Sequence, residues 1–361
     1  MIHRNEPRRY LFYFLLFLPL FFIFGPLNAQ EGQLIRVGKG DTISYLSFKL
    51  YGMYDARIEA LLRRENPRVK DLNVIYAGQQ LRFPAPETVR KMLLEEIAKP
   101  AKEMEPKEAR PLKEAPPGEE TVSAARVRAN KGVITFLEGE ARVKKAGEAE
   151  WSPAGPNMIL WQNDQIKVLA KSRAELILDN QTVLRLSENT WLTIQNLEEE
   201  AASQKETGRM QLSLGKLWTR TARLFNPSSR YDVTTPTAIA GVTGTVYLVK
   251  VADDKTTSIQ VFQGAVNVYN PFPPAKPSLP GQRTQLGQPQ EVTGPVEVPG
   301  PTAISREEWT KIILRQFQQI TVTDRDISRP ISFDMQKERQ DEWVRWNEER
   351  DSDFQPPARP R

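Results

Sequence analysis

Two spacings of apolar residues divide the chain into a short helical part and a longer β-rich part. In the first part, Ile43, Leu46 and Leu50 recur at the i, i+3 and i+7 positions that form one face of a helix. From residue 126 onward the period changes to two, as at Ile166 and Val168, which is the alternation of a half-buried strand. The pattern predicts a multidomain α+β chain, in which a small module precedes an all-β domain.

Residues 33–84 are predicted to fold as strand, helix, helix, strand. Either Asp41 or Thr42 accepts hydrogen bonds from the free N–H groups of the first helix, and Asp55 does so for the second. The element boundaries are marked by Leu34–Val37, Gly40-Asp41-Thr42, Tyr51-Gly52, Asn66-Pro67 and Ile75–Pro84. A domain this small buries little surface, so nearly all of its apolar residues belong to the core.

Three motifs in this order resemble a LysM domain: Gly40-Asp41-Thr42, Asn66-Pro67, and Ile75–Leu81 before Phe83-Pro84. The resemblance covers the whole segment and implies binding to N-acetylglucosamine-containing glycans, in bacteria usually peptidoglycan. It also implies a shallow groove between two loops, where backbone groups hold the N-acetyl substituents. The groove residues that it assigns are Gly40, Asp41, Thr42, Ile43, Asn66, Pro67, Ile75 and Tyr76.

Residues 126–270 carry the alternating pattern and are predicted to be all β, with turn sequences such as Ser187-Glu188-Asn189 between strands. Stacked hairpins, a sandwich and a β-solenoid are all consistent with this spacing of strands and turns. The expected strands contain Ile166–Ala170, Ala174–Leu178, Leu184–Leu186, Leu192–Ile194, Met210–Leu214, Tyr231–Val233, Thr245–Val251, Ser258–Phe262 and Ala265–Tyr269.

Two stretches of this domain resemble the FecR family: Ser172–Leu186, and Val233–Thr245 followed by Val261–Val268. The resemblance implies an extracytoplasmic β domain, known best from regulators that relay a signal from outer-membrane receptors to a sigma factor. Those regulators carry a cytoplasmic anti-sigma region before a membrane helix. Only about ten residues precede the apolar segment here, so we expect the domain to serve as a protein-interaction scaffold, with signalling as the alternative.

Residues 1–29 have the layout of a secretory signal peptide. Arg4, Arg8 and Arg9 precede an uncharged apolar run over 11–24, and Ala29 ends a cleavage sequence. The run is shorter than the roughly 20 residues of a membrane-spanning helix. We therefore expect export to the periplasm. The alternative is an uncleaved anchor in the inner membrane.

Composition removes several kinds of chemistry. The chain has no Cys and a single His, His3, which lies in the predicted signal peptide. A Ser-His-Asp triad, a Cys nucleophile and zinc held by His or Cys are therefore not expected in the exported chain. The 50 basic residues of the full sequence are interleaved with 45 acidic ones, so nucleic acid is not an expected partner. We predict no enzyme, cofactor or metal; a cell-wall hydrolase is a second alternative, disfavoured by the missing His and Cys.

Some residues of the β region could carry chemistry but also have structural explanations. Glu138 and Glu140 would share a strand face as a carboxylate pair, although two glutamates beside a turn are usually solvated. Gly241 and Gly244 are expected at a strand bend rather than in a phosphate-binding loop. The tryptophans that could stack on sugars, and are more often core or rim residues, are Trp151, Trp161, Trp191 and Trp218.

The remaining segments connect or follow these domains. Residues 85–125 are a linker rich in Pro, Glu and Lys, with a short helix over 87–98, and residues 271–303 are a Pro/Gly-rich segment. Residues 304–350 are predicted to form a helical tail. Its first helix has Ser305 and Glu308 as a capping box and presents Trp309, Ile312, Ile313, Phe317 and Ile320 on one face. The second covers about 334–350. Both helices are expected to pack on the β domain or on each other, or else to dock a partner.

Overall fold

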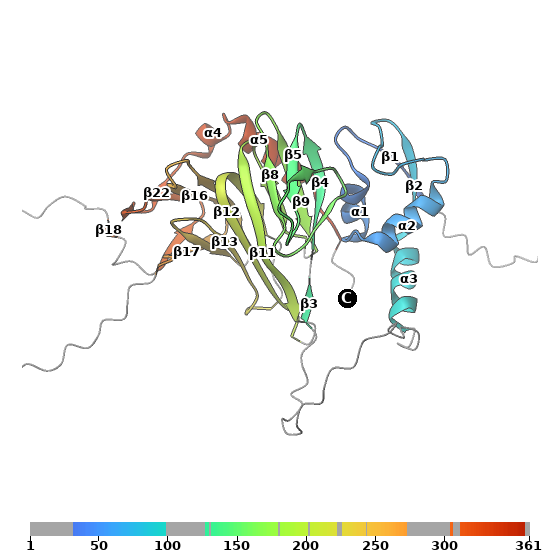
Figure 1. The fold of residues 1–361 in the computed structure, drawn as a ribbon, viewed down its shortest axis with the longest axis horizontal. Coiled ribbons are helices and arrows are strands. Elements are labelled where there is room, and N and C mark those ends of the chain that lie inside the picture. Colours follow the sequence, from blue (N-terminus) through green and yellow to red (C-terminus); the bar gives the residue numbers. More distant parts are fainter. Residues whose placement is uncertain are drawn as a thin grey trace, which may run out of the picture.

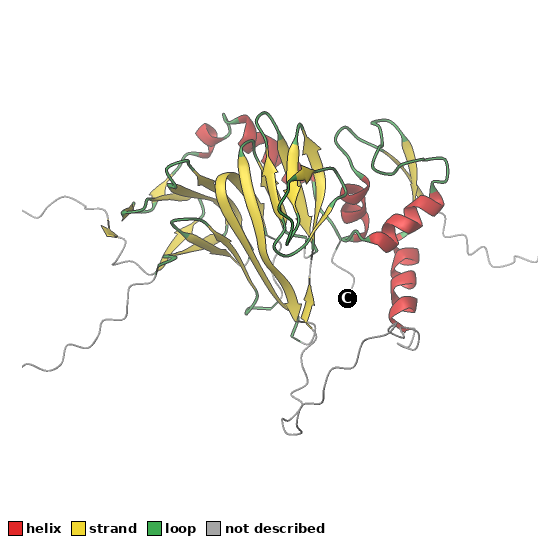
Figure 2. Cartoon of the chain, in the orientation of Figure 1, coloured by secondary structure: helices red, strands yellow, loops and turns green. Residues whose placement is uncertain are grey.

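The computed structural model describes residues 32–98, 127–129, 131–179, 181–200, 203–221, 226–242, 244–272, 304–305 and 311–357. The predicted signal peptide, residues 99–125 of the linker and residues 273–303 lie outside these residues. The described chain forms a small N-terminal module and a large β domain (Figures 1 and 2). None of the helices in these ranges has the length and apolarity needed to cross a membrane.

The small module has the predicted strand-helix-helix-strand order. Its elements are β1 (Gln33–Arg36), α1 (Ile43–Tyr51), α2 (Ala56–Glu65) and β2 (Gln80–Phe83), with β1 antiparallel to β2. Thr42 caps α1 by accepting a hydrogen bond from the N–H of Tyr45, and Asp55 caps α2. Gly52 ends α1 in the left-handed conformation, with φ of 71°, which glycine adopts without steric cost.

The module continues past the predicted boundary at residue 84. Helix α3 (Pro86–Ala98) follows β2 directly, and its Val89 and Leu93 are buried in the module's core. The linker was predicted from residue 85 because its composition is polar. Two apolar side chains one helical turn apart are sufficient to hold the first part of this segment against the module.

The β domain consists of two sheets that share the long strand β12 and close around one core. The first comprises, in spatial order, β19 (Lys311–Arg315), β17 (Ala265–Tyr269), β14 (Ile239–Val242), β13 (Arg230–Thr234), β12 (Lys205–Arg220), β11 (Thr190–Glu200), β8 (Gln165–Val168), β5 (Ala141–Lys144) and β6 (Ser152–Pro153), with β3 (Val127–Ala129) also beside β11. Pairing is antiparallel except between β12 and β13.

The second sheet comprises β7 (Ile159–Leu160), β4 (Gly132–Glu138), β9 (Arg173–Leu178), β10 (Val183–Leu186), β12, β15 (Val246–Val251), β16 (Thr257–Gln263) and β20 (Gln318–Val322), followed by β22 (Ile331–Ser332), β21 (Asp326–Ile327) and β18 (Ile304–Ser305). Alternating residues of both sheets, such as Ile166, Leu192, Leu176 and Leu184, form the shared core. Among the predicted architectures, the sandwich is nearest to this arrangement.

Strand β12 changes sheets at Gly215. Residues before it pair with β11 and β13, and residues after it pair with β10 and β15. Gly215 has φ of +94°, and a Cβ atom there would lie 2.5 Å from the Cα of Thr190. Only glycine fits both the conformation and the space, so this residue allows one strand to serve two sheets.

The prediction of a helix over the first part of the C-terminal tail is wrong. Residues 311–322 form strands β19 and β20, with Phe317 at the turn in the left-handed conformation. Strand β19 pairs with β17 and β20 pairs with β16, so the β domain extends beyond residue 270. Ile312 and Ile313 belong to the β-branched residues that fit a pleated strand, and sheet pairing outweighs the helical spacing. Glu308 and Trp309 lie outside the described residues.

The second predicted helix is present as α4 (Met335–Glu338) and α5 (Glu342–Asp353). Trp343 and Val344 of α5 form a small core with Trp218, Leu248 and Phe262 of the second sheet. Because these residues point away from the main core, α5 covers the outer face of that sheet. The helix therefore packs on the β domain, which is one of the arrangements expected from the sequence.

Candidate functional site

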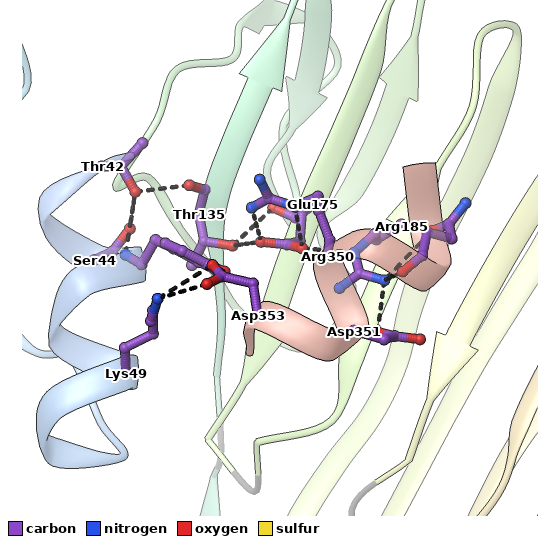
Figure 3. Close-up of polar contacts among 11 residues, drawn as sticks. Thr42, Ser44, Lys49, Thr135, Glu175, Arg185, Arg350, Asp351 and Asp353 are labelled. Atoms are coloured by element: carbon purple, nitrogen blue, oxygen red, sulfur yellow. Dashed lines mark hydrogen bonds and ion pairs between the residues drawn. The ribbon is translucent and has the colours of Figure 1, made fainter. Parts of the chain in front are cut away.

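The first predicted groove loop, residues 40–43, lies against the β domain. The Thr42 hydroxyl donates a hydrogen bond of 2.6 Å to the backbone oxygen of Thr135 in β4 (Figure 3). Gly40 lies under the ring of Phe136, where a Cβ atom would be 3.0 Å from Cε2. Ile43 is fully buried, and Asp41 accepts a hydrogen bond from the N–H of Gly38. Most of this loop is therefore occupied by contacts within the chain.

The second predicted groove loop divides into structural and exposed residues. Asn66 is buried; its side chain donates to the backbone oxygens of Leu62 and Arg82 and accepts from the N–H of Arg82. It therefore locks α2 to β2. Pro67 is exposed and Ile75 packs against the module core, whereas Tyr76 has 69% of its surface exposed.

A turn of the β domain contacts the start of α1 and the second loop through one side chain. The Asn157 carboxamide oxygen accepts a hydrogen bond of 2.9 Å from the N–H of Ser44, at the start of α1. Its carboxamide nitrogen donates one of 2.9 Å to Oδ1 of Asn73, in the second loop. Asn157, a residue that the sequence analysis did not single out, thus links Ser44, which follows the first loop, to Asn73, which lies between Pro67 and Ile75.

A buried ionic cluster lies at the junction of the small module, the β domain and α5 (Figure 3). Glu175 of β9 and Arg185 of β10 are fully buried and face each other across the two strands. The Glu175 carboxylate accepts from Nε of Arg185 at 2.6 Å, from both Nε and Nη2 of Arg350, and from the hydroxyl of Thr135. Nη1 of Arg185 also donates to Asp351 at 2.7 Å.

Electrostatics keep Glu175 ionised in this position. Burial alone would raise the pKa of its carboxyl group, but the charges and hydrogen bonds of Arg185 and Arg350 outweigh burial and lower the pKa to about 2. The same contacts raise the pKa of Arg350 against the opposing effect of burial. The cluster is therefore charged at all physiological pH values and ties α5 to the second sheet.

The far side of α5 contacts the small module. Asp353 accepts a hydrogen bond of 2.9 Å from the Tyr45 hydroxyl and forms an ion pair with Lys49, both on α1. Phe354 is fully buried beside the Tyr45 ring, and Arg350 lies 4.7 Å from the centre of that ring. The buried ring of Phe354, called the Phe354 plug below, therefore holds the module together with these polar contacts.

Several of the other residues considered from the sequence have structural partners in the β domain. Glu138 forms an ion pair with Arg173. Gly241 lies in β14, where a Cβ atom would be 2.9 Å from Oδ1 of Asp232. The tryptophans differ: Trp218 is buried, Trp151 and Trp191 pack edge to face, and Trp161 is 46% exposed. Within the described ranges, no group of three His, Cys, Asp or Glu side chains could hold a metal ion.

The sequence contained a weak signal for the buried cluster. Glu175 and Arg185 interrupt otherwise apolar strands, and a charged residue at such a position requires a partner of opposite sign. Their pairing follows from the hairpin register, but the contribution of Arg350 depends on where α5 packs. Spacing along the chain does not predict that placement.

Comparisons with known proteins find a family match for part of the chain. Residues 164–267 match the family described as FecR protein. This segment runs from the start of β8 to within β17, and it includes Glu175 and Arg185. No curated protein matches the chain significantly.

Two crystal structures of a candidate anti-sigma factor from Parabacteroides distasonis ATCC 8503 are also similar, each with 17% sequence identity and a TM-score of 0.34. They cover 50% of this chain, which spans 63% and 64% of the two solved chains.

Proposed function

We propose that the chain is a non-enzymatic regulator of FecR type, in which the β domain passes on a signal through its junction with the small module. The observation that carries this proposal is the FecR match over residues 164–267. The matched segment supplies Glu175 and Arg185, so the family-related part of the chain also provides the centre of the junction. This function was the alternative in the sequence analysis, where a scaffold was expected.

The junction has properties suited to a two-state element. A buried ion pair gives little net stabilisation compared with apolar packing, but it tolerates only one arrangement of its partners. Movement of α5 would separate Arg350 from Glu175 and Asp353 from Lys49 in one step. Such a coupled set favours either the docked or the separated arrangement over intermediate ones.

Gene expression in the source bacterium tests this function. A deletion strain is complemented with the wild-type gene, with Arg350→Met, or with the surface variant Glu148→Gln as a control. We expect deletion to change a defined set of transcripts, and Arg350→Met, but not Glu148→Gln, to leave that set altered. Transcripts that are identical in all four strains would refute a regulatory role.

For location, we propose export to the periplasm, with residues 1–29 either removed or retained as an anchor in the inner membrane. A FecR-type regulator favours the retained anchor. Sequencing of the N-terminus in membrane and soluble fractions distinguishes the two forms: an intact terminus in the membrane supports the anchor, and a chain starting at Gln30 contradicts it.

Binding of peptidoglycan by the small module is a second candidate function. It is favoured by the proximity of the two predicted groove loops, which Asn157 joins through Ser44 and Asn73. Sedimentation with purified sacculi tests it. We expect residues 30–361 to sediment and residues 99–361, which lack the module with its α3, to stay soluble; a full chain that stays soluble would contradict peptidoglycan binding.

A further inference from the structure

The turn that carries Asn157 is built to hold this side chain in place. Asn157 has φ of 65°, a left-handed conformation that asparagine tolerates better than most residues. Its N–H donates to the backbone oxygen of Ile134 at 2.7 Å, and the N–H of Ile134 donates to Met158. These two bonds fix the turn to β4, so the carboxamide is presented from a rigid sheet rather than from a free loop.

The two groups that contact the carboxamide recognise an amide. The N–H of Ser44 supplies a donor for a carbonyl oxygen, and Oδ1 of Asn73 supplies an acceptor for an N–H. The end of an asparagine side chain, CH₂–CO–NH₂, has the same donor and acceptor groups as the acetamido substituent of an N-acetylated sugar. The space between Ser44 and Asn73, beside the predicted groove residues, is therefore occupied by a part of the same chain that resembles such a ligand.

We infer that Asn157 is an internal competitor for the groove, so that docking of the small module on the β domain and binding of an N-acetylated sugar exclude each other. This inference rests on the second candidate function, glycan binding. A sugar ring is larger than a carboxamide, and it would also meet Phe136 over Gly40 and the bond from Thr42 to Thr135. The sugar consequently binds only to molecules in which the module is separated from the β domain. The larger the docked fraction, the weaker the apparent affinity for the sugar.

The substitution Asn157→Gly tests this competition. It deletes the carboxamide, and glycine suits the left-handed backbone, so the β domain keeps its turn. Asn163→Gly is the matched control, because Asn163 also has a left-handed φ, of 68°, in an exposed turn of the β domain. Calorimetric titration of the chain from Gln30 with chitotetraose measures affinity; the deacetylated tetramer shows whether the acetamido group is required.

We expect Asn157→Gly to bind chitotetraose about tenfold more tightly than wild type, since two hydrogen bonds no longer hold the closed form. Asn163→Gly should match wild type, and the deacetylated tetramer should bind to none of the three proteins. Docking is followed independently by energy transfer between labels on introduced cysteines, because the chain has no native Cys. Chitotetraose should lower the transfer between module and β domain.

Each other result overturns the inference. Equal affinity for wild type and Asn157→Gly, or unchanged energy transfer on sugar binding, would show that the groove is open in the docked state. An equal gain in Asn163→Gly would assign the effect to turn flexibility. Absence of binding in all three proteins would refute both this inference and glycan binding, and it would leave the regulatory function to be judged by its own transcript test.

Discussion

Replacement of Glu175 by Gln removes the central charge of the junction with almost no change in shape. In the wild type, its carboxylate accepts four hydrogen bonds, three of them from Arg185 and Arg350. Arg185 has no exposed side-chain surface, so it cannot turn to water when its partner becomes neutral. Asp351 remains as its only ion-pair partner among the described residues.

The expected magnitude follows from the pKa of Glu175. This pKa is about 2 in the folded chain, compared with an ordinary value of 4.5. At roughly 1.4 kcal/mol per pKa unit, the ionised carboxylate contributes ~3 kcal/mol to the free energy of unfolding at neutral pH. Loss of one partner from a buried ion pair costs roughly 3–5 kcal/mol in other proteins, which agrees with this value.

The sign of the pH dependence is fixed by the lowered pKa. The contribution is fully present above the unfolded-state value and is lost as the pH falls from about 4.5 toward 2. Wild type should therefore lose stability through this range, and Glu175→Gln should lack that part of the acid dependence. At pH 3 the difference between the two proteins should shrink to about 1 kcal/mol.

Urea unfolding followed by tryptophan fluorescence at pH 7 and pH 3 provides the measurement. Trp218 and Trp346 lie beside the cluster and report its loss. The control is Glu138→Gln, because Glu138 also pairs with an arginine but is 55% exposed, so its loss should cost under about 1 kcal/mol. A loss of less than about 1 kcal/mol for Glu175→Gln at pH 7, with an unchanged pH dependence, would refute this account of the junction.

Three further substitutions probe separate contacts. Phe354→Ala should lower stability by about 3 kcal/mol and split unfolding into two calorimetric transitions, because the plug between module and β domain is gone; a single unshifted transition would contradict this. Gly208→Ala should cost at least ~2 kcal/mol in urea unfolding, because its Cβ would lie 2.1 Å from the Tyr231 ring, and a neutral effect would show that this ring moves freely. Asn66→Ala should cost about 2 kcal/mol and speed hydrogen exchange at Arg82, whose N–H it binds; unchanged exchange would rule out that role.

Local patterns predicted the elements well. The caps at Thr42 and Asp55 and the stop at Gly52 depend on neighbouring residues alone, and all three are present. The strands from β8 to β17, apart from β14, were predicted from the alternation of apolar residues along the sequence, which is also a local property. Expectations failed where a distant strand decided the outcome: Ile312 and Ile313 fit a helix or a strand equally well by spacing, and the free edge of β17 selects the strand.

The candidate site was less predictable for the same reason. The groove residues were assigned one at a time by resemblance, and no local pattern indicates that a turn more than a hundred residues away lies close to them. Asn157 follows Ser44 by 113 positions in the chain. Only the packing of the small module on β4 brings these residues together, and that depends on the shape of both domains.

The closing contact between Tyr45 and Asp353 spans 308 positions of the chain. During synthesis the small module emerges first, but its docking surface is assembled only after α5 has followed every strand of the β domain. Such a contact forms late, since the entropy of closing so long a loop must be offset by a β domain that is already folded. A chain that is truncated or cleaved before α5 therefore has a module without its Phe354 plug, with Tyr45 uncovered. The rate at which a protease cleaves the small module therefore reports whether α5, at the other end of the described chain, has folded into place.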